Sequence, residues 1–364
     1  MKKNILTAAV AALVATPFAA SADTTLFGQF EGSVDFLSAD SGANDSGIAA
    51  SSNSSRIGIK GAHDLGGGLK GVYHMEWGVS GTGDETGKGK DSNGDSFTKG
   101  DLSQRNRFVG LAGGFGTVII GRHDTPLKIV GRKADLFWST QLGQNRSLTN
   151  PSDGGPGWDL RVNNVLAYIS PKLGPVTVIA AYVTDHTLAG PSSPVVENND
   201  NSAYSVLAMG NFGPIFAAVG YEAHDLASST ETESAARLTL SGNLGAVKLV
   251  GFYQAAKDQG FTAGNDRNVF GVGASFKAGS NTFKGQFYKA DANKTKTKDG
   301  ATLMAVGIDH AMSKSTSVYA QYAMLDNDTN GTFALGGAGH GSKTSPAAAG
   351  DTLSGVSLGI RVKF

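Results

Sequence analysis

Basic side chains recur in short segments of this 364-residue chain in which apolar and polar residues alternate. Arg56 and Lys60 fall on one face of such a segment, while Ile57 and Ile59 fall on the other. Further cations sit in or beside similar segments: Arg105 and Arg107, which share a face, and Arg122 and Arg161. Like charges about 4 Å apart repel by about 1 kcal/mol even in water. A cluster of this kind therefore indicates a counter-ion or a function that uses charge.

Catalytic and metal-binding patterns are weak by comparison. The segment GRHD, Gly121–Asp124, holds a close His–carboxylate pair, but neighbouring residues on a loop rarely form a catalytic pair. The segment DNDTNG, Asp326–Gly331, has the spacing of a calcium loop, but its twelfth position is Gly337 instead of a bidentate Glu. The chain has no cysteine. We expect no enzyme activity, no metal and no cofactor, and an enzyme (a barrel hydrolase) is a remote alternative.

The first 22 residues have the pattern of a secretory signal peptide. Lys2 and Lys3 precede an apolar run, and Ala20-Ser21-Ala22 fits a cleavage site. We expect cleavage after Ala22, which leaves residues 23–364 as the folded part. No later stretch approaches the roughly 20 apolar residues of a membrane-spanning helix. The balance of 31 basic and 31 acidic residues argues against nucleic-acid binding.

The folded part has the composition of an all-β chain that is exported. The full chain is rich in glycine, with 51 residues of 364, and its hydrophobic content is only 40%. Two-residue periodicity predicts sixteen strands. They lie near residues 24–36, 54–63, 68–79, 104–112, 116–122, 160–170, 174–183, 202–212, 214–223, 234–243, 246–256, 267–277, 281–291, 300–310, 316–325 and 352–364.

The connections between the predicted strands alternate between short and long along the chain. Short turns such as PKLG and NFGP alternate with long polar loops, among them residues 37–53, 80–103 and 123–159. This alternation is typical of a transmembrane, antiparallel up-and-down β-barrel with sixteen strands. In such a barrel the last strand pairs with the first, because an open edge in lipid leaves backbone groups without partners. The terminal aromatic residue, Phe364, would then lie at the periplasmic interface.

Four segments carry a family resemblance that runs from Asp23 to Phe364. They are NSSRIGIKGAHDLGGGLKGVYHMEWGV, LSQRNRFVGLAGGFGTVIIGRHDTPLK, RVNNVLAYISPKLGPVTVIAAY and the terminal GIRVKF. Together they resemble the general porins of Gram-negative outer membranes. The resemblance implies a homotrimer of sixteen-stranded barrels in contact with outer-membrane lipid and lipopolysaccharide. It also implies passive diffusion of ions and small hydrophilic solutes, a third loop folded inward, and Phe364 as an outer-membrane targeting signal.

The resemblance also suggests where ion selectivity would arise. Arg56, Arg122 and Arg161 match the basic cluster on the pore wall, while Gln29 stands where some members of the family carry Lys. Lys60, Arg105 and Arg107 extend this cluster, because strand cations should face the lumen: on the lipid face they cost about 2–4 kcal/mol at the midplane. The loop 123–159 supplies the facing acids Asp124, Asp135, Asp153 and Asp159. A basic wall opposite an acidic loop creates a transverse field that biases ion flux, and we expect a weak anion preference.

The main alternative is a substrate-specific channel for anions or sugars on the same barrel. A sugar channel needs an aromatic track, and the chain has three tryptophans, Trp77, Trp138 and Trp158. Trp138 and Trp158 both fall in the third loop, so the alternative stays open.

Overall fold

The computed structural model describes residues 24–364 except for 42–46, 83–88, 91–95, 98–102, 151–156, 186–200, 337–340 and 342. The expected signal peptide, residues 1–22, and the candidate acid Asp153 lie outside the described residues.

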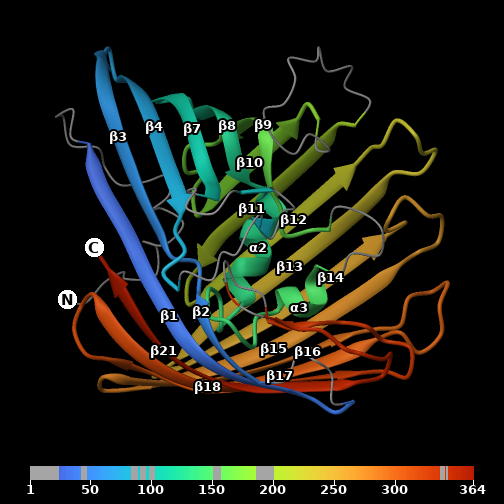
Figure 1. The fold of residues 1–364 in the computed structure, drawn as a ribbon. Coiled ribbons are helices and arrows are strands. Elements are labelled where there is room, and N and C mark those ends of the chain that lie inside the picture. The colour runs from blue at the N-terminus through green and yellow to red at the C-terminus, as the bar shows by residue number, and fades with distance from the viewer. Residues whose placement is uncertain are drawn as a thin grey trace.

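The described part of the chain folds into one antiparallel sheet that closes into a barrel (Figure 1). The first half of the sheet comprises β1 (Thr25–Ala39), β2 (Gly47–Ser52), β3 (Arg56–Gly66), β4 (Leu69–Gly78), β7 (Ser103–Gly113), β8 (Gly116–Asp124), β9 (Arg161–Ile169) and β10 (Val176–Val183). The second half comprises β11 (Ala203–Phe212), β12 (Ile215–His224), β13 (Glu233–Leu244), β14 (Val247–Lys257), β15 (Arg267–Ala278), β16 (Asn281–Ala290), β17 (Ala301–Ala311), β18 (Thr316–Asn327) and β21 (Thr352–Lys363). Two small hairpins, β5–β6 (Gly89–Lys90, Ser96–Phe97) and β19–β20 (Leu335–Gly336, Lys343–Thr344), lie in loops, as do the helices α2 (Pro126–Ala134) and α3 (Arg146–Thr149).

The 17 segments of this sheet in the described residues form sixteen barrel strands. Both β2 and β3 pair with β1, β3 along Thr25–Gln29 and β2 along Gly32–Leu37, so they are two parts of one interrupted strand. The sixteen strands predicted from periodicity are therefore confirmed. The predicted loop 37–53 is the exception, since it contains β2.

Tight turns join the strands at one end of the barrel. The turns after β11 and β13 place Gly213 at φ 64° and Gly245 at φ 60°, a left-handed conformation that a residue without Cβ adopts at little cost. The third loop connects β8 to β9, and its residues 125–150 and 157–160 are described. Figure 1 shows its helices α2 and α3 inside the ring of strands.

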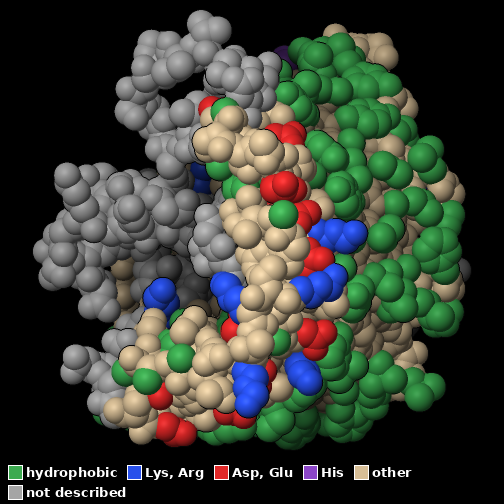
Figure 2. All heavy atoms as spheres, turned by 90° about the vertical axis from the view of Figure 1, so that its right-hand side faces the viewer, with side chains coloured by type: hydrophobic (Ala, Val, Ile, Leu, Met, Phe, Trp, Pro, Cys, Tyr) green, Lys and Arg blue, Asp and Glu red, His purple; other side chains and the backbone are tan. Residues whose placement is uncertain are grey.

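Apolar side chains form an outer band and an inner cluster. Outward residues such as Phe36, Ile120 and Leu358 are exposed, and Figure 2 shows hydrophobic side chains gathered along the barrel wall, apart from the charged ones. Inside, Phe137 and Leu142 of the third loop are fully buried in a cluster that includes wall residues of β14–β18 and β21. The third loop is thus packed onto the wall instead of hanging free in the interior.

None of the helices in the described ranges is long and apolar enough to cross a membrane.

The two ends of the sheet meet where β21 pairs with β1 from Gln29↔Lys363 to Ala39↔Leu353. Phe364 extends this pairing, because its carbonyl accepts from the Gly28 N–H at 2.9 Å and its N–H donates to the Gly28 carbonyl at 3.2 Å. The Phe364 ring stacks on Phe30 with 5.7 Å between ring centres. It lies over Gly28, where an added Cβ would come within 2.2 Å of the ring. The terminal residue is therefore fixed by both backbone and side chain.

Replacing Phe364 with Ala should destabilise barrel closure by about 0.5–1.5 kcal/mol, the typical contribution of an aromatic pair. Gly28→Ala should have a similar effect, since it displaces the same ring. The measurement is the temperature at which the folded, fast-migrating form converts to the unfolded form on electrophoresis. Phe283→Ala is the control, because Phe283 is an outer-face phenylalanine of similar exposure, 48% against 52%. If all three variants convert at one lowered temperature, the terminal ring has no special role.

Candidate functional site

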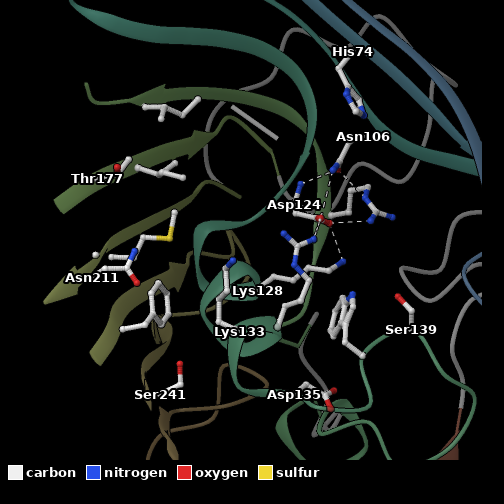
Figure 3. A pocket seen from close by; sticks show the side chains of 18 of the residues that line it. His74, Asn106, Asp124, Lys128, Lys133, Asp135, Ser139, Thr177, Asn211 and Ser241 are labelled. Atoms are coloured by element: carbon white, nitrogen blue, oxygen red, sulfur yellow. Dashed lines mark hydrogen bonds and ion pairs between the residues drawn. The ribbon is translucent and has the colours of Figure 1, made fainter. Parts of the chain in front are cut away.

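A cavity of about 1480 Å³ lies inside the barrel, between the third loop and the short turns. Its lining includes α2, the inward faces of several strands, and the turn at Pro171–Pro175. Figure 3 shows α2 projecting Lys128 and Lys133 into this space, near the strands that carry Thr177, Asn211 and Ser241.

The helix α2 presents cations to the cavity and apolar residues to the wall. Thr125 caps its N-terminus, with Oγ1 accepting from the Lys128 N–H at 3.3 Å, and Pro126 occupies the first turn, where its missing N–H is not needed. Leu127 and Val130 are fully buried against the wall. Its basic residues, Lys128, Arg132 and Lys133, all line the cavity.

A single carboxylate, Asp124, offsets several of these cations. One oxygen lies 3.0 Å from Lys128 Nζ and 3.0 Å from Arg161 Nη2, and the other lies 3.6 Å from Arg132 Nη1. Asn106 accepts from Arg161 Nε at 2.9 Å and from the Asp124 N–H at 3.0 Å, and so holds the pair in place. Asp124 is 3% exposed, so its carboxylate interacts with the neighbouring cations and not with bulk water.

A second group of charges lines the wall of β1, β3, β4 and β7. Glu76 forms ion pairs with Arg105 and with Arg56, the latter at 3.6 Å. Glu31, nearby on β1, accepts from Arg361 Nε at 2.7 Å and Nη2 at 2.6 Å. These carboxylates are buried, at 6% and 2% exposure, whereas the guanidinium groups that they hold reach further into the cavity.

Four of the six predicted wall cations line the cavity, namely Arg56, Lys60, Arg105 and Arg161. Arg107 and Arg122 are not among the residues that line it. They lie opposite each other across β7 and β8, and Arg107 also lies opposite Met75, which is exposed on the outer face. Residues directly opposite in an antiparallel pair share a face.

A β-bulge in β7 explains why Arg107 points outward. Trp77 pairs with Gln104 and Met75 pairs with Arg107, so two residues of β7, Arg105 and Asn106, stand opposite Glu76 alone. Both reach inward, where Arg105 contacts Glu76 and Asn106 contacts Asp124. The extra residue flips the following alternation, and Arg107 points outward.

Among the described residues, the predicted acids Asp135 and Asp159 serve mainly to fold the third loop. Asp135 accepts from the N–H groups of Phe137 at 2.9 Å and Asn145 at 3.0 Å, and from Gln286 Nε2 at 2.9 Å. It is 8% exposed at the edge of the cavity, and burial raises its pKa to about 6. Among the described loop residues, α2 adds Lys128, Arg132 and Lys133 to the cavity lining, where they outnumber Asp135.

Asp159 is fully enclosed and holds the loop to the wall. Its two oxygens accept from Arg237 Nη1 at 2.7 Å and Nη2 at 3.1 Å. Burial alone would raise the pKa of Asp159, but the charge and hydrogen bonds of Arg237 outweigh burial and lower it. Arg237, at 1% exposure, also donates to the backbone carbonyls of Leu127 and Thr149 at 3.3 and 3.2 Å. One arginine of β13 thus fastens both ends of the loop.

The histidine of GRHD contacts the backbone of its neighbour. His123 Nδ1 contacts the backbone oxygen of Asp124 at 2.7 Å, not its carboxylate. His224 ends β12 and lies between Glu233 at 2.7 Å and Glu222 at 3.0 Å. Trp158 stacks on it at 5.0 Å and is 1% exposed, so this group packs the loop and does not line the cavity.

Asp326–Gly331 makes ordinary loop contacts, with the Asn327 amide donating to the carbonyls of Phe333 and Asp351. No group of three or more His, Asp or Glu residues in the described ranges is arranged to hold a metal ion.

Sequence reasoning missed most of the cations around the cavity. Those on the loop are Lys128, Arg132, Lys133 and Arg146, and those on strands and turns are Lys172, Lys248, Arg361 and Lys363. The signal for the first group was present in PLKIVGRKA, where Lys128 and Arg132 are spaced four apart behind a Thr-Pro start.

Comparison with known proteins agrees with this geometry. The sequence profile of the family described as Gram-negative porin matches residues 9–330. The chain belongs to the Gram-negative porins.

Individual relatives extend this result. The porin is 30% identical to outer membrane porin protein 32 of Delftia acidovorans, over all of both chains. It is 34% identical to a major outer membrane protein P.IB of Neisseria gonorrhoeae over 40% of this chain and 38% of the relative. Its structure resembles a solved anion-selective porin from Comamonas acidovorans with a TM-score of 0.77 and 26% identity, covering 94% of this chain and 100% of that one.

This porin is therefore an outer-membrane channel of the general porin type, and its family and fold point to a channel and not to an enzyme. The third loop, fastened inside the barrel, limits the space through which solutes pass.

Breaking the Arg237–Asp159 pair should loosen this loop. Asp159→Asn leaves a buried guanidinium without its counter-charge, a change that typically costs about 3–5 kcal/mol. We expect larger current fluctuations and an altered single-channel conductance in planar bilayers. The matched control is Asp299→Asn, which breaks the buried Arg267–Asp299 pair, of 2.8 Å, away from the third loop. Equal current traces from the two variants would show that Arg237 stabilises the barrel without setting the pore.

Proposed function

We propose that this porin is a diffusion channel with a preference for anions. The observation that carries the proposal is the charge of the cavity: among the described residues, its lining contains twelve Lys and Arg side chains and three carboxylates, Glu76, Asp124 and Asp135. Cations in a narrow, low-dielectric passage raise the local concentration of anions and the rate at which they enter.

The distribution of these cations supports the proposal. They lie on both sides of the passage, with Arg56, Arg105 and Arg161 on the wall and Arg132 and Lys133 on the loop. Further cations continue toward the short turns at Lys172 and Lys363. The solved relative titled an anion-selective porin, at 26% identity, is consistent with the same preference.

Several finer features are also proposals. We infer removal of residues 1–22, a homotrimer, contact with outer-membrane lipid and lipopolysaccharide, and no catalytic role. The outward Arg107 supports an oligomer, because an arginine would cost about 2–4 kcal/mol against lipid at the midplane, and a protein neighbour lowers that cost. Migration of the unheated protein at the mass of a monomer would contradict the trimer.

A sugar-specific channel is less well supported. Trp138 lines the cavity, with Arg132 5.9 Å from its ring centre, but Trp158 is buried behind the loop. A track for sugars needs several aromatic rings in a row, and these two do not form one.

Removing charge from both sides of the passage should reduce the anion preference. In a tenfold KCl gradient, Arg132→Gln combined with Arg161→Gln should shift the reversal potential toward cations. The shift should shrink at high salt, because the Debye length falls from about 10 Å at 0.1 M to about 3 Å at 1 M. Arg122→Gln is the control, since Arg122 does not line the cavity. A wild-type reversal potential in the double variant at low salt would rule out these residues as the selectivity site.

The anion preference should also fall as the pH rises. Burial lowers the pKa of Lys128 to about 7, partly offset by Asp124, and burial with Arg132 and Lys248 lowers the pKa of Lys133 to about 8. Both side chains are charged below these values and neutral above them, so the passage loses positive charge between pH 6.5 and 9. Reversal potentials measured across this range should move toward cations in the wild type. The Lys128→Arg, Lys133→Arg variant should hold its preference, and an equal drift in both proteins would place the titrating groups elsewhere.

A further inference from the structure

One corner of the cavity is lined by apolar side chains, which is unusual for the inside of a water-filled barrel. We call this the apolar strip: Ile169, Ile179, Met209 and Phe216. The strand pairing places them together. Ile169 lies opposite Ile179 across β9 and β10. Met209 of β11 and Phe216 of β12 line the same side, because their respective cross-strand partners Thr177 and Asn211 also line the cavity.

Packing against α2 explains why some residues of the apolar strip are apolar, but it does not explain Phe216. Ile179 and Met209 belong to a buried cluster with Ile129 and Val130 of α2. Phe216 packs only at the edge of that cluster and stays partly exposed toward the cavity. An aromatic face is thus available to a solute beside the helix.

Two cations lie next to this aromatic face. Lys133 Nζ is 5.8 Å from the centre of the Phe216 ring. Lys248 lines the cavity from β14, opposite Asn243 of β13, and Ser241 on that same strand pairs with Phe216 of β12. No carboxylate of a described residue lies within 4.0 Å of either lysine nitrogen, in contrast to the cations around Asp124 and Glu76. Among the described residues, no carboxylate forms an ion pair with either lysine.

Polar side chains complete the surroundings. Thr177, Asn211, Ser241 and Asn243 line the cavity on the same wall, and Figure 3 shows Lys133 near the strands that carry the first three. Hydroxyl and amide groups here can donate to or accept from a bound oxygen. The corner therefore combines unpaired positive charge, an apolar face and hydrogen-bonding groups, the combination typical of a small-molecule site.

We propose that this corner binds small organic monoanions that carry an apolar group, such as aromatic carboxylates. The carboxylate lies between Lys133 and Lys248, and the apolar body covers Phe216 and Met209. An inorganic anion gains only the attraction to the lysines, whereas an amphipathic anion also removes apolar surface from water. This inference rests on the proposed anion preference and adds a solute class to it.

The test is the block of chloride current through single channels in planar bilayers, with benzoate as the probe and acetate as its counterpart without a ring. Benzoate should half-block at a concentration about fivefold lower than acetate, or less, given the area of the ring. Benzylamine, which has the ring but the opposite charge, should not block.

Variants separate the two parts of the site. Phe216→Ser should make the half-blocking concentrations of benzoate and acetate nearly equal. Phe216→Leu, which keeps an apolar side chain, should retain much of the difference between these two concentrations. Lys133→Gln should raise the half-blocking concentration of benzoate about fivefold, the factor expected for one ionic contact in water. Lys172→Gln is the matched control, because Lys172 lines the same cavity at a turn. It should change the half-blocking concentration of benzoate much less than Lys133→Gln does.

Equal block by benzoate and acetate in the wild type would overturn the site, as would equal effects of Lys133→Gln and Lys172→Gln on the half-blocking concentration of benzoate. The reversal potential of the same channels in KCl tests the proposed function separately. An anion-preferring channel that treats benzoate and acetate alike would overturn only the binding site, whereas a channel without anion preference would overturn the proposed function.

Discussion

A sheet that crosses a lipid bilayer has to close on itself, because backbone groups at an open edge find no water to bond. In this porin the closure is the pairing of β1 with β21, carried to the last residue by Phe364 and Gly28. Closure creates an enclosed interior, and the diameter of that interior follows from the number of strands. The side chains and loops inside can then vary as long as the ring of hydrogen bonds stays intact.

The interior imposes a second constraint, since a long loop placed there needs its own attachments. The third loop meets it with an apolar contact at Phe137 and Leu142 and with a buried ion pair at Asp159 and Arg237. A buried ion pair is expensive to desolvate, so it is weak evidence for stability, but it specifies one arrangement of the groups that it joins. Because Arg237 also binds carbonyls at Leu127 and Thr149, it fixes the path of the loop and with it the position of α2.

Using carboxylates for attachment has an electrostatic consequence. Asp135 and Asp159 are enclosed by donors within the loop and the wall, and Asp124 and Glu76 are each shared by more than one cation. The carboxylates are therefore bound by donors of the protein itself, while a larger number of lysines and arginines still face the cavity. A chain with equal numbers of acidic and basic residues can in this way line its passage with one sign of charge.

The strands could be predicted from the sequence because their signal is local: two-residue alternation marks each strand, and turn residues mark each end. The faces of individual cations could be predicted only where the alternation is unbroken, as at Arg56 and Lys60. At Arg105–Asn106 a bulge inserts one residue, and Arg107, assigned to the lumen by simple alternation, points outward. Nothing in the single sequence marks that bulge, because it depends on the pairing with Glu76 of the neighbouring strand.

The third loop was harder to predict for a related reason. Its acids were visible as residue types, but which of them face solvent depends on partners such as Arg237 and Gln286, which lie 78 and 151 positions further along the chain. The same long-range contacts turn α2 so that Lys128, Arg132 and Lys133 meet the cavity. The sign of the charge that lines the passage is thus a property of the closed barrel. Strand pairing determines which carboxylates are enclosed, and the remaining cations determine the electric field that acts on a solute.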